Sequence, residues 1–540
     1  MEAHAPADLR DAVAPTPVAE GSFGLASADF EATSRSTAHW SGTRMNRLVV
    51  AALVVIAGCS QRSLTEHTAT ADPETQAPAA TSTEPSAPAP RPRDPPLYPA
   101  WVVIGAVTGP TMNQLSIEEE VAAVEDLLGA DRGLLLYAGG PGSRGVLVSG
   151  RAADAPPVDP LFLLVGDLLG GANLRDSHYR PLSVNPHAPA TEPKIRAALA
   201  GALDAPGDRL TIWLAGHGEQ VEEPWDANVG TWGGATFDNA TLQALLLSNK
   251  AGRPVHFIGT QCYGGGFADA LVEASERACG AFAAVWIRPA SGCDPDPTAL
   301  RTSYGVHLRA ALKGQAIAPD LDQNGVLGLS EAHVSAVLGL SGIDVPTLSS
   351  QYLLERAQGL SEIDEADPDA DTSLPDSLFE EHHIVNTLLE RLGLGLGVFD
   401  QAYDEAVLEA EAFDASHTFE TKELDAAAAD ARGQVLARWP ELEDPWHPDF
   451  TATFANNRAT IARFFETSPE VALWLSEREE YSESDDLRYQ HELKLRAIER
   501  AAINLRTLRF ATKAFEKPAL FERFWRLRDC ERAPVAMRRP

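Results

Sequence analysis

The chain has 540 residues, several times the length of a typical domain of about 100–200 residues, so two or three folded units joined by linkers are expected. Its 44 Lys and Arg residues against 77 Asp and Glu residues give a net charge of −33. This acidity argues against nucleic-acid binding, because phosphate contacts need clustered basic side chains. Five cysteines are too few for a disulfide scaffold, and their odd number means that each needs its own interpretation.

A short apolar run precedes the first cysteine. Residues 48–58 are apolar, Met45 lies between two arginines just before them, and Cys59 follows a glycine. The run is far shorter than the about 20 residues that span a bilayer, so it is typical of the h-region of a signal peptide. The sequence Val-Ile-Ala-Gly-Cys-Ser at 55–60 resembles a bacterial lipoprotein lipobox, which implies that Cys59 is lipidated and becomes the mature N-terminus. The alternative is a cytosolic protein with a short buried helix.

The segments on either side of this signal peptide, which we place at 45–59, are not expected to fold. Residues 1–44 show no convincing period, and translation that begins at Met45 would leave them out. Residues 60–99 are rich in Pro, Thr and Ala and cannot bury enough apolar surface to fold, which indicates a tether. We therefore expect a lipid-anchored protein of the cell envelope, on the periplasmic side or at the cell surface.

Beyond residue 100 short apolar runs alternate with helical patterns, which predicts an α/β unit with a mostly parallel sheet and helices on both faces. Strands are expected at 101–106, 134–137, 210–215, 255–259 and 283–287. Apolar residues at helical spacing predict helices at 117–128, 194–203, 239–247, 267–278 and 302–312.

Two reactive side chains directly follow two of these strands. Strand 210–215 runs into Gly-His-Gly, which contains His217, and strand 255–259 runs into Thr-Gln-Cys-Tyr-Gly, which contains Cys262. In parallel sheets functional groups gather beyond the carboxyl ends of the strands, so neighbouring strands would bring a nucleophile and its base together. The backbone N–H groups of Gly218 and Cys262 would then form an oxyanion hole. Taken alone, a histidine in a turn or a buried cysteine is more often structural.

The order of these motifs resembles the caspase-like cysteine peptidases of clan CD, which include caspases, legumains, metacaspases and gingipains. The chain has an apolar strand with His-Gly and, 45 residues further on, an apolar strand with Gln-Cys-x-Gly. The segments at 113–118, 231–233 and 237–242 are similar to the family as well, so the resemblance covers roughly residues 100–335.

This resemblance implies a caspase-like fold and a peptidase mechanism. In it Cys262 attacks the scissile carbonyl of a protein or peptide substrate, the N–H groups of Gly218 and Cys262 hold the oxyanion, and His217 protonates the leaving amine. It implies no third catalytic residue and no cofactor for catalysis. The residue preferred before the cleaved bond stays open, because Arg288, Asp294 and Asp296 also fit ordinary solvated loop charges.

Two other functions remain compatible with these residues. One is a catalytically silent caspase-like module that binds peptides or partner proteins. The other is a calcium-dependent surface scaffold protein, in which the C-terminal helices carry the function.

A calcium-type loop is expected at 320–331. The twelve residues fit the pattern D-x-[DN]-x-[DN]-G-x5-E, which presents oxygen ligands to Ca²⁺. A structural role is expected, in which Ca²⁺ clamps the helix before the loop to the helix after it. An ordinary acidic turn is the alternative. The ligands would be the side chains of Asp320, Asp322, Asn324 and Glu331 and the carbonyl group of Val326.

The peptidase domain is expected at 100–345, followed by an acidic linker at 346–377 and an all-α domain at 378–540. The expected helices are 378–392, 401–411, 422–438, 450–465, 469–481 and 485–515. The geometry of strand 283–287 argues against a disulfide between Cys279 and Cys293, and Cys530 has no evident partner. An inhibitory cap that is released by cleavage in the linker is one hypothesis for the helical domain.

Overall fold

The computed structural model describes residues 94–143, 145–149, 159–170, 177–274, 277–292, 299–316, 319–360, 374–443 and 448–535. The expected signal peptide with Cys59 and most of the expected tether lie outside these residues. The described parts of the sheet and of the C-terminal helices fall within a single compact unit. Within the described ranges, none of the helices combines the length and the apolar character that crossing a bilayer requires.

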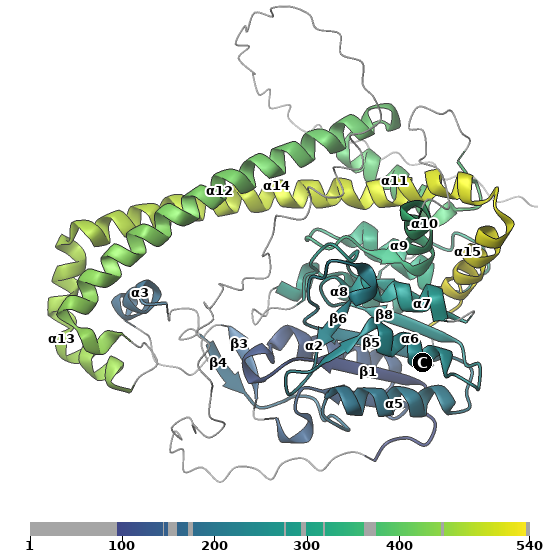
Figure 1. Cartoon of the computed structure of the whole chain (residues 1–540), viewed down its shortest axis with the longest axis horizontal. Helices are drawn as coiled ribbons and strands as arrows, with labels where there is room; N and C mark the ends of the chain where they lie inside the picture. The colour runs from purple at the N-terminus through teal and green to yellow at the C-terminus, as the bar shows by residue number, and fades with distance from the viewer. Residues whose placement is uncertain are drawn as a thin grey trace, which may run out of the picture. The chain divides into compact units, whose positions relative to one another are not determined.

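A six-stranded sheet forms the centre of the α/β part (Figure 1). Its strands are β1 (Trp101–Ala106), β2 (Gly133–Tyr137), β5 (Leu210–Gly216), β8 (Val255–Gly259), β9 (Ala278–Phe282) and β10 (Thr347–Leu348). Their order is β10-β9-β8-β5-β1-β2, and all pairs are parallel except that of β10 with β9. Every residue of β1, β5 and β8 is buried, which explains why these strands appear in the sequence as continuous apolar runs.

Helices cover both faces of this sheet, as the sequence predicted. Alternate residues of β1 separate two cores, with Trp101 and Val103 in one and Val102 and Ile104 in the other. The first core includes side chains of α2 (Leu115–Leu128), α8 (Tyr304–Leu312) and α9 (Leu329–Gly339). The second includes side chains of α5 (Glu192–Asp204), α6 (Asn239–Leu247) and α7 (Ala268–Ala274).

Two short hairpins lie outside the main sheet. One pairs β3 (Val146–Ser149) with β4 (Ser177–Arg180), and the other pairs β6 (Asn228–Gly230) with β7 (Thr236–Asp238). The helix α3 (Pro160–Leu168) lies between β3 and β4 in the sequence.

The prediction of a strand at 283–287 is wrong, because the structure places the corresponding strand, β9, at Ala278–Phe282. This strand consists mostly of small residues, and at Gly280 a Cβ atom would lie only 2.6 Å from the carbonyl oxygen of Phe257. Small residues give little β propensity, whereas the run Ala-Ala-Val-Trp-Ile that follows gives more. That run instead leaves the sheet, and Val285 N–H donates to Val345 O at 2.9 Å.

The linker expected at 346–377 begins later than predicted. Thr347–Leu348 forms the edge strand β10, and α10 (Ser349–Gly359) follows it directly. Residues 361–373, which hold most of the acidic run, lie outside the described residues. The α/β part therefore extends to residue 359.

The C-terminal part is helical, as predicted, but its helices are longer. They are α11 (Phe379–Leu392), α12 (Leu396–Arg438), α13 (Pro448–Thr467), α14 (Pro469–Ala514) and α15 (Pro518–Glu531). The two longest, α12 with 43 residues and α14 with 46, pack against each other (Figure 1). Each joins two predicted helices, because no Gly or Pro interrupts the chain at 412–421 or 482–484. Helix α15 lies beyond the last helix that the sequence predicts.

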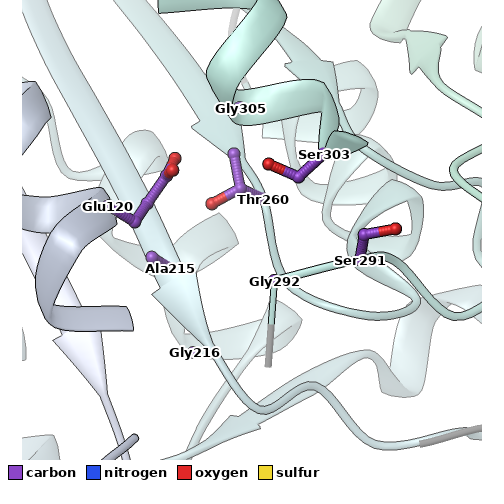
Figure 2. A pocket seen from close by; sticks show the side chains of 8 residues that line it. All are labelled: Glu120, Ala215, Gly216, Thr260, Ser291, Gly292, Ser303 and Gly305. Atoms are coloured by element: carbon purple, nitrogen blue, oxygen red, sulfur yellow. The ribbon is translucent and has the colours of Figure 1, made fainter. Parts of the chain in front are cut away.

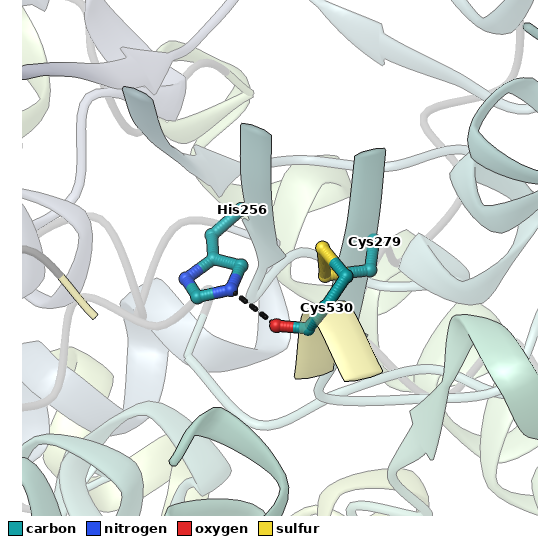
Figure 3. Close-up of side chains that lie close together, drawn as sticks. All are labelled: His256, Cys279 and Cys530. Carbon is teal, nitrogen blue, oxygen red and sulfur yellow. Dashed lines mark hydrogen bonds between the residues drawn. A yellow bond between two sulfur atoms is a disulfide. The ribbon is translucent and has the colours of Figure 1, made fainter. Parts of the chain in front are cut away.

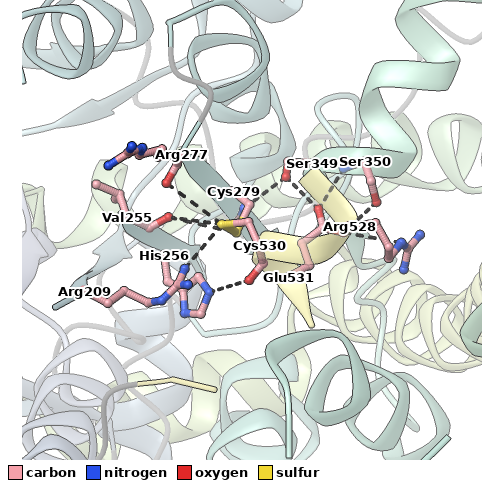
Figure 4. The surroundings of a disulfide bond; sticks show 11 residues. Arg209, Val255, His256, Arg277, Cys279, Ser349, Ser350, Arg528, Cys530 and Glu531 are labelled. Atoms are coloured by element: carbon pink, nitrogen blue, oxygen red, sulfur yellow. Dashed lines mark hydrogen bonds and ion pairs between the residues drawn. A yellow bond between two sulfur atoms is a disulfide. The ribbon is translucent and has the colours of Figure 1, made fainter. Parts of the chain in front are cut away.

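A disulfide joins the sheet to this helical part (Figure 4). Cys279 in β9 is bonded to Cys530 in α15, with their Cα atoms 6.0 Å apart. The expectation that Cys530 has no partner is therefore wrong, since neither β9 nor α15 was placed correctly from the sequence. Near the disulfide, the Glu531 carboxylate accepts hydrogen bonds from the hydroxyls of Ser349 and Ser350, at 2.7 and 2.6 Å.

A buried histidine lies beside the same disulfide (Figure 3). His256 Nε2 is 2.8 Å from the carbonyl oxygen of Cys530. Burial, together with the nearby charge of Arg209, lowers the pKa of His256 to about 3, so the ring is neutral at physiological pH. A carbonyl oxygen can only accept, so Nε2 carries the proton of the neutral ring and ties β8 to α15.

The disulfide yields a prediction for a chain that is cut between the two parts. We expect a protein cleaved at a protease site inserted between residues 366 and 367 to stay in one piece on a non-reducing denaturing gel. Cys279 precedes the cut and Cys530 follows it, so only a reductant should separate the fragments. The pairing would be contradicted if the C-terminal fragment separated without reductant and the Cys530→Ser variant gave the same result.

Candidate active site and calcium-type loop

The pairing of two central strands places His217 and Cys262 at matching positions. β5 and β8 are neighbours and run parallel, with Leu214 opposite Gly259. The N–H group of Thr260 donates to Leu214 O at 2.9 Å, so the register continues past the last paired residues. Three residues beyond this pair, one chain reaches His217 and the other reaches Cys262. Both residues therefore lie at the carboxyl edge of the sheet, on adjacent strands.

Gly218 lies directly against the main chain of Cys262. A Cβ atom on Gly218 would lie 2.0 Å from the Cys262 carbonyl oxygen, so no other residue fits without displacing the backbone. Gly218 also pairs with Val229 in an antiparallel bridge, in which Gly230 N–H donates to His217 O at 3.1 Å. Gly218 and Val229 thus form a non-hydrogen-bonded pair, in which the N–H group of each residue points away from the partner strand. The Gly218 N–H is therefore suited to bind a developing oxyanion.

The orientation of His217 is set by a backbone carbonyl. Its Nε2 atom lies 3.0 Å from Met112 O. Because a carbonyl only accepts, Nε2 carries the proton of a neutral ring, and Nδ1 keeps the lone pair that can take a proton. Sequence reasoning missed Met112, since every residue type offers the same carbonyl group.

A buried asparagine fixes the segment that carries this carbonyl. Asn113, which follows Met112, is fully buried. Its Nδ2 donates to Gly145 O at 2.7 Å, and its Oδ1 accepts from the Tyr137 hydroxyl. The segment at 113–118, which carried part of the family resemblance, thus supports the position of His217.

The Cys262 thiol is buried and is contacted by one residue of a distant loop. Its residue is 3 % exposed, Ala290 N–H donates to Sγ at 3.3 Å, and the thiol in turn donates to Ala290 O at 3.4 Å. The N–H donor stabilises a thiolate and the carbonyl acceptor stabilises the neutral thiol, so the Ala290 main chain contacts the sulfur in either protonation state. The next residue, Tyr263, has a φ of +57°, a left-handed conformation that is uncommon outside glycine and that recurs at functional sites.

A small pocket lies at the same edge of the sheet (Figure 2). Its free volume, which includes the part open to solvent, is about 240 Å³. The side chains of Glu120, Thr260 and Ser303 point toward one another in it, whereas the hydroxyl of Ser291 points away (Figure 2). Glu120 forms an ion pair with buried Arg309 and accepts a hydrogen bond from Trp213 Nε1 at 3.1 Å, so it does not give the pocket a free negative charge.

The loop charges that were weighed as specificity residues have different roles or lie outside the description. Arg288 forms an ion pair with Glu499 of α14, with Nη2 2.6 Å from Oε1, and only 17 % of its side chain is exposed. It therefore neither faces the pocket nor lies free in solvent. Asp294, Asp296 and Cys293 lie outside the described residues.

The calcium-type loop brings its carboxylates together. It lies between α8 and α9, and one ligand oxygen from each of Asp320, Asp322 and Glu331 lies within 4.8 Å of the others. Gly325 has a φ of +73°, the conformation that the sixth position of such a loop needs. All of these donors are oxygens, so the loop fits a hard cation such as Ca²⁺.

Hydrogen bonds inside the loop hold it in a folded shape. Gly325 N–H donates to Asp320 Oδ2 at 3.1 Å, and Val326 N–H donates to Asn324 Oδ1 at 2.7 Å. The Glu331 carboxylate accepts from the N–H groups of Leu321 and Gly328, at 2.7 and 3.1 Å, and so caps the start of α9.

Comparison with models of known protein families gave no match, and a search of curated protein sequences found no relative. The fold and the site define the class: a mixed α/β protein with a mostly parallel six-stranded sheet, a C-terminal helical region, and a histidine and a cysteine at adjacent strand ends.

The carboxylate cluster yields a prediction for calcium. We expect Ca²⁺, and not Mg²⁺ at the same concentration, to raise the melting temperature, because a ligand that binds only the folded state adds about 2.7 kcal/mol at a hundredfold excess over its Kd. The variant Asp320→Asn should lose most of this shift, since it removes one of three carboxylates. Asp404→Asn, an exposed residue of α12, is the matched control and should keep it. An equal shift in all three proteins would show that Ca²⁺ binds elsewhere.

Proposed function

We propose that this protein is a caspase-like cysteine endopeptidase, in which Cys262 and His217 form a catalytic dyad that cleaves peptide bonds in proteins. The observation that carries this proposal is the parallel register of β5 and β8, which puts the two residues at matching positions on one edge of the sheet. The backbone of Gly218 against Cys262 and the Met112 carbonyl on His217 support it.

The proposed reaction uses each of these groups in turn. The Cys262 thiol gives its proton to Nδ1 of His217, and its sulfur forms a bond to the carbonyl carbon of the substrate. The carbonyl oxygen becomes an oxyanion, which the Gly218 and Cys262 N–H groups stabilise. As the C–N bond breaks, His217 returns the proton to the leaving amine, and a thioester remains on Cys262. Water then hydrolyses the thioester, with His217 as the base, and restores the thiol.

The pocket beside the proposed dyad is small, so it would admit only the tip of one side chain of the bound polypeptide. Thr260 lines it and lies two residues before the nucleophile, and Ser291 and Gly292 follow the residue that contacts the thiol. Glu120, which lines the pocket, is paired with Arg309, so these two residues give the pocket no net charge. A polar or small uncharged side chain therefore fits the pocket better than an unpaired lysine or aspartate.

We further propose that the protein works outside the cytoplasm, anchored by a lipid on Cys59. The disulfide between Cys279 and Cys530 supports this, because disulfides form and persist in oxidising compartments. The calcium-type loop fits the same location, where Ca²⁺ is plentiful, and there the ion would hold α8 and α9 together.

One observation favours a second candidate, the silent caspase-like module. Cys262 is only 3 % exposed, and both polar main-chain atoms of Ala290 lie against its sulfur. With 3 % of its surface exposed, Cys262 offers a substrate carbonyl little access to Sγ. A module that binds peptides at this edge without cleaving them requires no such access.

Labelling of the thiol separates the two candidates. We expect a peptidyl electrophile to label wild-type protein at Cys262 and to leave Cys262→Ala unlabelled. His217→Ala should keep the fold, as measured by circular dichroism, and should lower kcat by about 10²- to 10⁴-fold, the usual contribution of a general acid–base. Probes with Asp, Asn, Arg, Lys and Ala before the electrophile, tested with and without Ca²⁺, cover the preferences that the sequence left open. If none of them labels Cys262, the endopeptidase proposal is wrong and the silent module is favoured.

A further inference from the structure

Residues 283–292, which follow β9, pass beside Cys262, the proposed nucleophile. Contacts with other parts of the chain hold this segment in place. Ala290 contacts the Cys262 sulfur through its N–H group at 3.3 Å. Arg288 O accepts the N–H of Tyr263 at 2.9 Å, so the same segment also fixes the residue that follows the nucleophile. Its position determines what surrounds the thiol.

A buried carboxylate anchors this segment. Asp344 is fully buried, and its two oxygens accept hydrogen bonds from the N–H groups of Ser291 and of Tyr304, the latter at 2.6 Å. Ser291 directly follows Ala290, and Tyr304 begins α8. Burial raises the pKa of Asp344 to about 6, although the two N–H donors oppose this, so the group is mainly ionised above neutral pH.

The buried carboxylate is in turn held by the C-terminal helix α14. Arg500 Nη1 donates to the carbonyl oxygens of Gly342 and Asp344, both at 2.9 Å. Burial lowers the pKa of Arg500 to about 10, which leaves the guanidinium charged at physiological pH, near the Asp344 carboxylate. The main chain on both sides of residue 343 is therefore fixed by one arginine.

Other residues on the same face of α14 contact the same segment. Glu499 binds Arg288 with a 2.6 Å ion pair, and Ile503 packs with Val285 and Val345 in a small apolar cluster. Residues 499, 500 and 503 follow the spacing that puts side chains on one side of a helix. A distinct face of α14 therefore supports the loop that contacts the nucleophile.

We propose that Asp344 and Arg500 are positioning residues, which hold the Ala290 main chain against the Cys262 thiol and so set its reactivity. The C-terminal helical region is then part of the active site and not a cap that cleavage removes, a conclusion that agrees with its disulfide link to β9. The consequence for peptide cleavage rests on the proposed function, whereas the effect on the thiol does not.

The pH dependence of thiol alkylation tests this proposal. The second-order rate of iodoacetamide reaction at Cys262, followed by mass spectrometry of its peptide, has a midpoint set by ionisation and a plateau set by access. Displacement of the Ala290 main chain removes an N–H donor that stabilises the thiolate and a carbonyl acceptor that stabilises the thiol. The first contact is charge-assisted and S–H is a weak donor, so the midpoint should move upward by about one pH unit. We expect this shift in Arg500→Ala, and in Asp344→Asn, whose amide NH2 would face one of the two N–H donors.

The controls separate positioning from a loss of stability. Arg509, like Arg500, lies on α14, and Arg509→Ala removes an exposed ion pair with Asp400 of α12, at 3.0 Å. This variant should leave the midpoint unchanged. Arg500→Lys keeps a cation that can donate to at least one carbonyl and should shift the midpoint less than Arg500→Ala. If Arg500→Ala does not fold, Asp344→Asn and Arg500→Lys provide the comparison, with melting temperatures as the measure of stability.

Two results would overturn the inference. One is an unchanged midpoint in folded Asp344→Asn and Arg500→Lys, and the other is an equal shift in Arg509→Ala. Because alkylation needs no substrate, the profile decides the inference even if the wild type cleaves no peptide. If the wild type does cleave a peptide, kcat should fall in the Asp344 and Arg500 variants while KM changes little, since the contacts they support are to the nucleophile.

Discussion

The parallel pairing of β5 with β8 is the constraint on which the site depends. Because Leu214 lies opposite Gly259, the two chains leave the sheet side by side, and equal lengths of chain lead to His217 and Cys262. A shift of this register by one residue would turn one of the two side chains to the other face of the sheet. Because Gly218 has no side chain, the segments that follow β5 and β8 stay in contact beyond the last paired residues of the two strands. The Met112 carbonyl and the Ala290 main chain then fix the imidazole and the sulfur.

The helical region contributes to the same site. Arg500 and Glu499 of α14 reach the segments that hold Ala290 and Tyr263, and the disulfide between Cys279 and Cys530 closes a loop of 251 residues around them. The contact between Glu499 and Arg288 is a largely buried ion pair. Removing one partner of such a pair costs much more free energy than forming the pair contributes, because it leaves a buried charge without compensation. The arrangement therefore acts less as added stability than as a requirement that the helices and the sheet fold together.

The sequence was most informative where a single element determines the pattern. Buried strands such as Val255–Gly259 and the glycine-flanked His217 and Cys262 were found from local signals, and so was the loop that ends at Glu331. Strand β9 was misplaced because Gly280 and its small neighbours fit there through their lack of bulk, which allows close packing. Scales of β-strand propensity do not capture this requirement. Main-chain groups such as Met112 O have no residue signature, and the roles of Asp344, Arg500 and Cys530 depend on partners that lie 40 to 251 residues away in the chain.

The most direct measurement of the central claim is a cross-link between positions 217 and 262. In parallel neighbouring strands, residues in register lie about 5 Å apart, within the 4.4–6.8 Å between Cα atoms that a disulfide requires. In a Cys293→Ser background, the substitution His217→Cys should give a disulfide with Cys262 under mild oxidation, seen as a linked peptide pair by mass spectrometry. Glu222→Cys, five residues further on, should not. Formation of the Cys279–Cys530 bond with no link between positions 217 and 262 would contradict the register and, with it, the proposed dyad.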